Sequence, residues 1–284
     1  MSETAQKLDR LRDELRGLGS LLVCFSGGID SALLLKVAHD VLGDRALGMT
    51  AVSASLPPGE REAAAEVARA VGAAHVFVET REIEKPGYQA NGPDRCFHCK
   101  TELYDVAVAE RARRDIAHVA SGIITEDLGD HRPGLDAARA HGVRFPLVDA
   151  GFDKRDVRAA AEHLGLTIWN KPASACLSSR IPYGTSVTPE RLSKIGGLEA
   201  ALKGLGFRQV RVRYHETGAG EHAATLARIE VELAELPRMV EPGVRDAVVA
   251  AGKAAGFRHV TIDLAGYRMG SANELLSGRS LKVI

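Results

Sequence analysis

The feature that most constrains this chain is a glycine turn between an apolar segment and a helical pattern. The apolar residues 21–25 lead into the sequence SGGIDS at residues 26–31, and residues 32–38 continue with helical periodicity. Consecutive glycines let backbone N–H groups converge on one point, and the first turn of the helix adds unpaired N–H groups and its positive dipole end. The pattern predicts a site that grips a phosphate or pyrophosphate group.

This motif is neither of the two common nucleotide loops. No lysine precedes the hydroxyl residue, as GxxxxGK[ST] requires, and the glycines do not fit GxGxxG. SGGIDS instead resembles the PP-loop of the ATP pyrophosphatase superfamily, whose members split ATP between the α and β phosphates and transfer AMP to an acceptor. The simpler alternative is a tight strand-to-helix turn with Ser31 as a helix cap. The resemblance implies ATP contacts from Ser26, Gly27, Gly28, Asp30 and Ser31.

Length and charge narrow the class of protein. A chain of 284 residues with 45% hydrophobic residues can bury a full core and is expected to divide into two domains. Basic and acidic residues balance at 37 each, which removes the overall attraction that a nucleic-acid binder shows. Leucines 8, 11, 15 and 18 recur at helical spacing among charges, with no apolar signal region. We therefore expect a cytoplasmic protein with no nucleic-acid or membrane partner.

The order of elements predicts an α/β fold. Apolar segments near 21–25, 46–52, 74–79 and 116–121 alternate with helical patterns near 31–42, 59–72, 101–114 and 153–164, which is typical of a parallel sheet covered by helices. From residue 185 the sequence pattern changes, and the segment GFRQV at 206–210 recurs as GFRHV at 256–260. We expect a PP-loop domain at 1–184, of adenine nucleotide α-hydrolase type, and a smaller α/β domain for substrate binding or oligomerisation at 185–284.

Nucleotide contacts are expected where the parallel strands end. Segments that leave the carboxyl ends of strands meet at one edge of the sheet, where the glycine turn also falls. Ser53 follows the second apolar segment, and Asp127 lies in the loop of residues 121–132 after the fourth. We predict that both contribute to the ATP or Mg²⁺ site.

Four cysteines carry further chemistry. In a cytoplasmic chain, four cysteines argue against a disulfide framework and for a role in metal binding or catalysis. Cys96 and Cys99 form a CxxC that brings two thiolates within reach of one metal. Cys176 lies in a loop-like run with the nearby cation Arg180, whereas Cys24 stands in an apolar strand and is expected to be a core residue.

Together these segments resemble one family closely. SGGIDS, DRCFHCK at 94–100, LGDHRPG at 128–134 and KPASACLSSR at 171–180 are similar to the ATP-dependent sulfur transferases that mature the nickel-pincer nucleotide cofactor of lactate racemase. The similarity extends through RVRYH at 211–215 and ARIEV at 227–231. It implies AMP transfer from ATP and Mg²⁺ to the carboxylates of pyridinium-3,5-biscarboxylic acid mononucleotide, followed by sulfur insertion to give thiocarboxylates.

Two sulfur sources occur in the family that this chain resembles. In one, a single cysteine matching Cys176 gives up its sulfur and becomes dehydroalanine. In the other, three cysteines hold a 4Fe-4S cluster that passes on sulfide from an external source. The chain has Cys96, Cys99 and Cys176, which matches the second pattern. The alternative is a structural zinc at Cys96 and Cys99, assisted by His98 or His131, with Cys176 as the sacrificial donor.

The second domain offers candidate substrate contacts. Strict alternation places Arg211 and Arg213 on one strand face, and the segment that contains Glu230 alternates too. If the two strands pair, cross-strand Arg–Glu salt bridges are one interpretation. The resemblance implies the other, in which the arginines grip the substrate phosphate. Ser179, Arg180, Glu199 and Glu230 are further candidates for substrate or metal contacts.

Three rival functions can be compared with this one. A tRNA-thiolating PP-loop enzyme would need a basic RNA-binding surface and often further zinc cysteines, and neither is visible in the sequence. An amidating synthetase would need an ammonia source, and no glutaminase domain fits in the remaining length. A nucleotide- or metal-binding sensor would bind ATP and never split it. The family resemblance also implies a homo-oligomer built from trimers.

Overall fold

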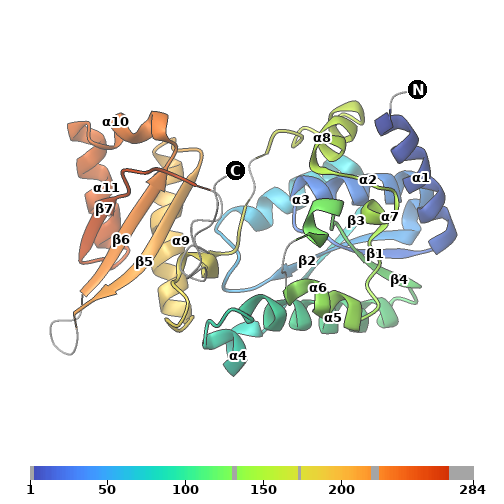
Figure 1. Ribbon diagram of the computed structural model, residues 1–284, viewed down its shortest axis with the longest axis horizontal. Helices are drawn as coiled ribbons and strands as arrows, with labels where there is room; N and C mark the ends of the chain where they lie inside the picture. Colours follow the sequence, from blue (N-terminus) through green and yellow to red (C-terminus); the bar gives the residue numbers. More distant parts are fainter. Residues whose placement is uncertain (1–2, 130–132, 172–173, 219–223, 269–284) are drawn as a thin grey trace. The chain divides into compact units, whose positions relative to one another are not determined.

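The computed structural model describes residues 3–129, 133–171, 174–218 and 224–268 (Figure 1). Its contacts divide the chain into two compact units. The first comprises residues 1–53, 59–85 and 94–174, and the second comprises residues 54–58, 86–93 and 175–284. Among the described helices, none is both long and apolar enough to cross a membrane.

The first unit is built on a parallel sheet, as the sequence predicts. Its strands are β1 (Leu21–Cys24), β2 (Ala46–Val52), β3 (Ala74–Glu79) and β4 (His118–Ser121), in the order β3-β2-β1-β4. Every pairing is parallel, with Leu21 opposite Ala46 on one side and His118 on the other. All four strands therefore end at the same edge, which confirms the α/β prediction.

Helices cover both faces of this sheet (Figure 1). Alternate side chains of β1 enter different cores: Leu21 and Val23 one, Leu22 and Cys24 the other. The first core takes α1 (Glu3–Leu18), α2 (Ile29–Leu42), α3 (Glu60–Val71), α7 (Pro146–Asp149) and α8 (Lys154–His163). The second takes α5 (Arg95–Arg113) and α6 (Pro133–Ala140). Short 3-10 turns lie at η1 (Gly43–Arg45), η2 (Glu82–Glu84) and η3 (Thr125–Leu128).

The second unit holds a smaller sheet in the order β5-β6-β7. Strands β5 (Val210–Thr217) and β6 (Ala224–Val231) are antiparallel, whereas β6 and β7 (His259–Ile262) are parallel. The helical elements are α4 (Pro86–Gln89), η4 (Leu177–Arg180), α9 (Pro189–Gly204), η6 (Leu233–Glu235), α10 (Leu236–Met239) and α11 (Pro242–Ala254).

The recurring GFR segments mark two helix–strand units. α9 leads to β5 and α11 leads to β7, each through a glycine with positive φ, Gly206 at 91° and Gly256 at 85°. The phenylalanine that follows each glycine is buried, and its amide bonds back to the helix. The two segments therefore end their helices in the same way, as the repeat predicts.

The division between the units differs from the predicted boundary at residue 184. It falls between Ser174 and Ala175, and two short upstream segments join the second unit. Backbone hydrogen bonds explain why: the Leu177 amide donates to Ser55, and the Gly184 amide donates to Asn91, at 2.9 and 3.1 Å. A boundary placed along the sequence cannot anticipate segments 54–58 and 86–93, which pair with residues more than 80 positions away.

Candidate functional site

The glycine turn of residues 26–31 forms a closed hydrogen-bonded loop at the carboxyl end of β1. The Ser26 amide donates to the Ser31 hydroxyl at 3.2 Å, and that hydroxyl donates to the Gly28 carbonyl at 3.0 Å. The Gly28 amide in turn donates to the Ser26 hydroxyl at 3.3 Å. Ser31 therefore ties both ends of the loop together, which is more than a helix cap alone would do.

Two glycines make this loop sterically possible. Gly27 has φ of 70°, and a Cβ there would lie 3.1 Å from the Cα and Cβ atoms of Ala64 on α3. Gly122, directly after β4, lies even closer to the start of α2, because its Cβ would stand 2.7 Å from the Ser31 amide. The loop is thus confined between α3 and the end of β4 while Ser26 stays exposed.

Asp30 lies in the first turn of α2 and is engaged by a lysine. Lys154 Nζ lies 2.7 and 2.8 Å from the two carboxylate oxygens of Asp30. Lys154 begins α8, where Asp153 caps the helix and Glu126 accepts the Lys154 amide at 2.9 Å. Both partners of the pair keep about a third of their side-chain surface exposed. The loop amides, a carboxylate and an ammonium group therefore gather at one accessible place.

Lys171 is a second cation at this loop. Its Nζ lies 2.9 Å from Glu60 on α3 and 3.3 Å from the Gly27 carbonyl oxygen. The sequence alone assigned no role to Lys154 or Lys171, because neither occupies a position of a nucleotide-loop motif. In the sequence, Lys154 lies in the FDKRD segment, where a helix begins. Lys171 lies in the KP dipeptide before the cysteine loop.

The other predicted nucleotide contacts lie in segments that follow the carboxyl ends of strands β2 and β4. Ser53 follows β2 directly and is half-buried. Asp127, in η3, accepts the Ile124 amide at 3.1 Å and so caps its own turn. Their roles toward ATP or Mg²⁺ stay predictions. Three residues of the predicted loop, Asp130, His131 and Arg132, lie outside the described residues, as do 172–173 and 219–223.

In the second unit, Cys176 is half-buried in a tightly held loop. Its carbonyl oxygen accepts from the Ser179 amide at 3.1 Å, the Ser179 hydroxyl at 2.8 Å and Arg180 Nη1 at 2.9 Å. The next residue, Leu177, donates its amide to Ser55. These contacts fix the backbone on both sides of the thiol.

Arg180 holds this loop from inside. It is 2% exposed, and its Nη1 also donates to the Ala175 carbonyl at 2.9 Å. Its Nε and Nη2 donate to the two carboxylate oxygens of Glu199 on α9, at 2.8 and 3.1 Å. Glu199 accepts the Val212 amide as well. A buried bidentate pair thus connects the Cys176 loop to α9 and β5.

Arg213 forms the matching pair across the sheet. Its Nε and Nη2 donate to the two oxygens of Glu230, both at 2.9 Å, and its Nη1 donates to the Ser179 carbonyl at 2.9 Å. Arg228 lies 3.2 Å from Glu230 and also pairs with Asp263. The salt-bridge interpretation is therefore confirmed for Arg213, and the pair is buried rather than solvated. The two carboxylates predicted as contacts, Glu199 and Glu230, each bind an arginine.

Arg211 points from the same strand face into different surroundings. It is 8% exposed, donates from Nη1 to the Val210 carbonyl, and its guanidinium lies 5.2 Å from the ring centre of Tyr267. Burial and the neighbouring charge of Arg180 lower the pKa of Arg211. An anion brought to this place would offset the charge of Arg180.

The cysteines occupy three different environments. Cys96 and Cys99 lie in the first two turns of α5, three residues apart on one helix face, with Cys96 exposed and Cys99 half-buried. They belong to the first unit and Cys176 to the second. Within each unit, the described residues gather no group of three or more His, Cys, Asp or Glu side chains that could hold a metal. Cys24 is buried, and burial raises the pKa of its thiol to about 12, which confirms it as a core residue.

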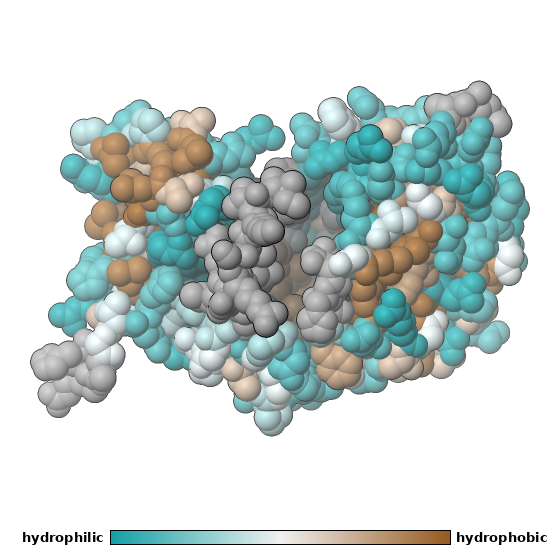
Figure 2. Space-filling view, viewed as in Figure 1, coloured by the Kyte–Doolittle hydropathy of each residue, from teal (hydrophilic) through white to brown (hydrophobic). Residues whose placement is uncertain are grey.

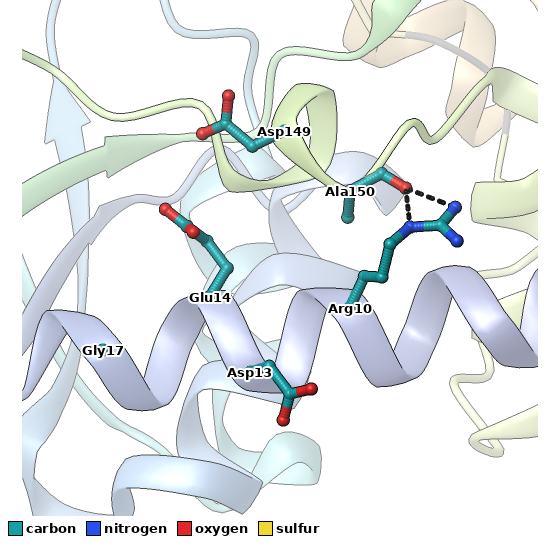
Figure 3. A pocket seen from close by; sticks show the side chains of 6 residues that line it. All are labelled: Arg10, Asp13, Glu14, Gly17, Asp149 and Ala150. Atoms are coloured by element: carbon teal, nitrogen blue, oxygen red, sulfur yellow. Dashed lines mark hydrogen bonds between the residues drawn. The ribbon is translucent and has the colours of Figure 1, made fainter.

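A cavity of about 390 Å³ lies elsewhere in the first unit, between α1 and α7 (Figure 3). Figure 3 shows Arg10 reaching across to the Ala150 carbonyl, with Nη2 at 3.1 Å. Burial and the charge of Glu14 raise the pKa of Asp149 on its wall. Its lining includes none of the predicted site residues, and so we do not assign it to the functional site.

Known proteins resemble this chain over most of its length. An uncharacterised protein of Synechocystis is 41% identical over 271 residues, covering 95% of this chain and 98% of that protein. The pyridinium-3,5-bisthiocarboxylic acid mononucleotide synthase of Lactiplantibacillus plantarum is 37% identical over 282 residues, covering 99% of both. The chain belongs to the family of this synthase. No family model matches it.

A more distant match covers about half of the chain. The glutamine-hydrolysing GMP synthase of Aeropyrum pernix is 29% identical over 165 residues, which cover 52% of this chain and 32% of that protein. With membership of the synthase family, this match confirms an ATP-dependent enzyme of the PP-loop type.

Proposed function

We propose that this enzyme uses ATP to activate the carboxylates of pyridinium-3,5-biscarboxylic acid mononucleotide and then inserts sulfur, producing thiocarboxylates for a nickel-pincer cofactor. The observation that carries the proposal is the closed loop of residues 26–31 with Asp30 and Lys154 beside it. The substrate named for the L. plantarum synthase, which this chain matches over 99% of its length, supports the substrate class.

The loop supplies what cleavage of ATP between the α and β phosphates requires. Loop and helix amides bind the pyrophosphate, and Lys154 adds a positive charge at the same place. Asp30 fits Mg²⁺ by its chemistry, since it is a partly exposed carboxylate in the first turn of α2. Mg²⁺ held by Asp30 would neutralise phosphate charge, and Lys154 would then be released toward the phosphates.

Activation by AMP solves a chemical problem. A carboxylate oxygen is a poor leaving group, and a mixed anhydride with AMP divides one difficult substitution into two easier ones. The carboxylate attacks the α phosphate, pyrophosphate leaves, and a sulfur nucleophile later displaces AMP. Repetition on the second carboxylate gives the dithio product.

Cys176 is the residue that we propose at the sulfur-transfer step. Arg180 and Ser179 fix its backbone through hydrogen bonds to the Cys176 carbonyl oxygen, which holds the thiol in one place for the transfer. We propose that Arg180 and Glu199 position this loop. The Arg180 guanidinium donates hydrogen bonds to the Glu199 carboxylate and to three oxygen atoms of the loop.

The donor set of the chain fits a 4Fe-4S cluster by number and chemistry, with thiols at Cys96, Cys99 and Cys176. Residues 86–93, directly before the CxxC, are hydrogen-bonded to residues 181–187, downstream of Cys176. Such a cluster would supply sulfide from an external source to the activated carboxylate. The sacrificial alternative uses the Cys176 sulfur itself.

The arginine face of β5 is proposed to bind the substrate phosphate. Arg211 is the stronger candidate of the pair, because its buried guanidinium lies near the like charge of Arg180 and a phosphate dianion would offset that charge. Arg213 is already paired with Glu230, and it donates a hydrogen bond to the Ser179 carbonyl oxygen, which helps to hold the Cys176 loop. We further propose a cytoplasmic homo-oligomer built from trimers.

The proposal is tested by release of pyrophosphate. Protein purified under anaerobic conditions is incubated with ATP, Mg²⁺ and either the mononucleotide or a mixture of tRNAs. Release with the mononucleotide alone supports the proposal. Release only with tRNA would favour a tRNA-thiolating enzyme, and binding of ATP without release in either case would favour a sensor.

A further inference from the structure

Two side chains, from the neighbouring strands β2 and β3, form a chain of hydrogen bonds with the backbone of the residue that follows β1, beside the nucleotide loop. Thr50 on β2 donates its hydroxyl proton to the Phe25 carbonyl oxygen at 2.7 Å. His75 on β3 places Nε2 2.8 Å from the same hydroxyl oxygen. Phe25 immediately precedes the loop. We call this set the His75–Thr50–Phe25 relay.

The direction of the two hydrogen bonds follows from the number of protons. A hydroxyl group has one proton and two lone pairs, and a carbonyl oxygen only accepts. Since the Thr50 proton points to Phe25, His75 must donate from Nε2. Burial lowers the pKa of His75, so the ring is a neutral Nε2–H tautomer at neutral pH.

Packing holds the imidazole in this orientation. Its ring stands edge-on to Phe25 and Phe77, with centroids 5.4 and 4.6 Å apart. Gly48 lies opposite His75 in the strand register, and a Cβ at Gly48 would come within 3.3 Å of His75 Cδ2. Arg61 covers the far side of Phe77. The ring therefore has little freedom to turn away from Thr50.

The relay acts on the first peptide of the loop. The amide group between Phe25 and Ser26 is planar, and so the direction of the Phe25 carbonyl also sets the direction of the Ser26 N–H. That N–H donates to the Ser31 hydroxyl at 3.2 Å. One peptide is thus held on both edges, by Thr50 on one side and by Ser31 on the other.

We infer that His75 and Thr50 are positioning residues for the nucleotide site, which fix the entrance of the loop in its phosphate-binding geometry without touching the nucleotide. The inference rests on the proposed function of the loop. It predicts an effect on ATP affinity that exceeds any effect of the same substitutions on folding.

The test compares variants that break the relay with variants that keep it. His75→Leu and Thr50→Val remove the hydrogen bonds, whereas His75→Gln retains a donor at the position of Nε2 and Thr50→Ser retains the hydroxyl. The control is His118→Leu, a histidine at the amino end of β4. Calorimetry gives the Kd of Mg-ATP for each, and a thermal melt reports folding.

The relay predicts that His75→Leu and Thr50→Val weaken ATP binding about tenfold. The two conservative variants and the control stay within about twofold of the wild type. Because His75 acts through Thr50, the double variant is expected to bind no more weakly than Thr50→Val alone. If Thr50→Val does not fold, the comparison of His75→Leu with His75→Gln carries the test.

Two results would overturn the inference while the proposed function stands. In one, the wild type binds ATP and His75→Leu binds it equally well, with at most a lower melting temperature. In the other, His75→Gln loses as much affinity as His75→Leu. Failure of the wild type to bind ATP would instead overturn the proposed function and the inference with it.

Discussion

Lys154 and Asp30 form a bidentate ion pair at the glycine loop, although 124 positions separate them in the chain. Such a pair between partly exposed groups adds little to stability, because solvent screens it. Its position beside the loop amides fits the proposed role in binding a charged ligand. In that proposal, the pair supplies a carboxylate for the metal and an ammonium group for the phosphates.

The first prediction concerns Asp30. Asp30→Ala is expected to abolish pyrophosphate release and to leave the melting temperature nearly unchanged, since it removes the proposed Mg²⁺ ligand and no core contact. Asp40→Ala on the same helix removes a comparable ion pair, with Lys36, and is the matched control. Normal turnover in Asp30→Ala would contradict the proposed role of Asp30 in binding Mg²⁺.

Lys154 is predicted to act on ATP and not on the mononucleotide. Lys154→Met is expected to raise KM for ATP about tenfold or more, since a charge-assisted hydrogen bond to phosphate is lost. Lys36→Met serves as control. Steady-state kinetics with each substrate varied in turn provide the measurement, and an equal rise in both KM values would argue against this role.

Arg211 is predicted to act on the other substrate. Arg211→Ala is expected to raise KM for the mononucleotide and to leave ATP affinity unchanged, because the guanidinium is proposed to bind the substrate phosphate. Arg208→Ala, a change just before the same strand, is the control. Equal losses for both substrates would favour a folding role.

Much of the first unit was predictable because its signals are local. The strand, glycine turn and helix start are contiguous, and β1 to β4 appear as separate apolar segments. The arginine pairs were predictable only in part. Alternation placed Arg213 and Glu230 on strands that pair, yet the register that sets them diagonally, with Arg211 opposite Glu230, depends on the hairpin between the strands.

Contacts between residues that lie far apart in the chain could not be predicted from the sequence. Lys154 meets Asp30, Tyr88 meets Ser178, and Asn91 donates to three carbonyl oxygens of residues 181–185, all through the fold. Asn91 also adopts φ of 53°, which a sequence pattern does not reveal for a residue other than glycine. The upstream segments 54–58 and 86–93 join the second unit for the same reason.

His141 gives a prediction of pH dependence. Its Nδ1 lies 2.7 Å from the Ala137 carbonyl oxygen and its Nε2 lies 2.9 Å from Asp105 on α5. Both partners accept hydrogen bonds, which raises the pKa of His141, the backbone carbonyl having the largest effect. A raised folded-state pKa means that the stabilisation is complete below about pH 6.5, the usual value, and is lost as pH rises through the folded-state value.

The comparison of wild type with His141→Gln measures this effect. Melting temperatures recorded between about pH 5.5 and 8.5 are expected to differ most at the acidic end and to converge at the basic end. A difference that stays constant with pH would show that the imidazole contributes by packing alone.

The sulfur source is tested by iron content. If Cys96, Cys99 and Cys176 hold one cluster, alanine at any of them lowers iron content and the broad visible absorption after anaerobic reconstitution. The control is Cys24→Ala, which removes a buried core thiol and is expected to leave the iron content unchanged. In the sacrificial alternative, Cys96→Ala and Cys99→Ala stay active for one turnover, and Cys176 loses one H₂S in intact-mass analysis.

The central claim is that ATP cleavage drives sulfur into a carboxylate of the mononucleotide. Its most direct test supplies anaerobically reconstituted protein with ATP, Mg²⁺, sulfide and pyridinium-3,5-biscarboxylic acid mononucleotide, and follows product mass and pyrophosphate together. The account predicts a product in which sulfur has replaced one oxygen per carboxylate, with one pyrophosphate and one AMP released for each sulfur inserted. Pyrophosphate release without a sulfur-containing product, or such a product formed without ATP, would contradict it.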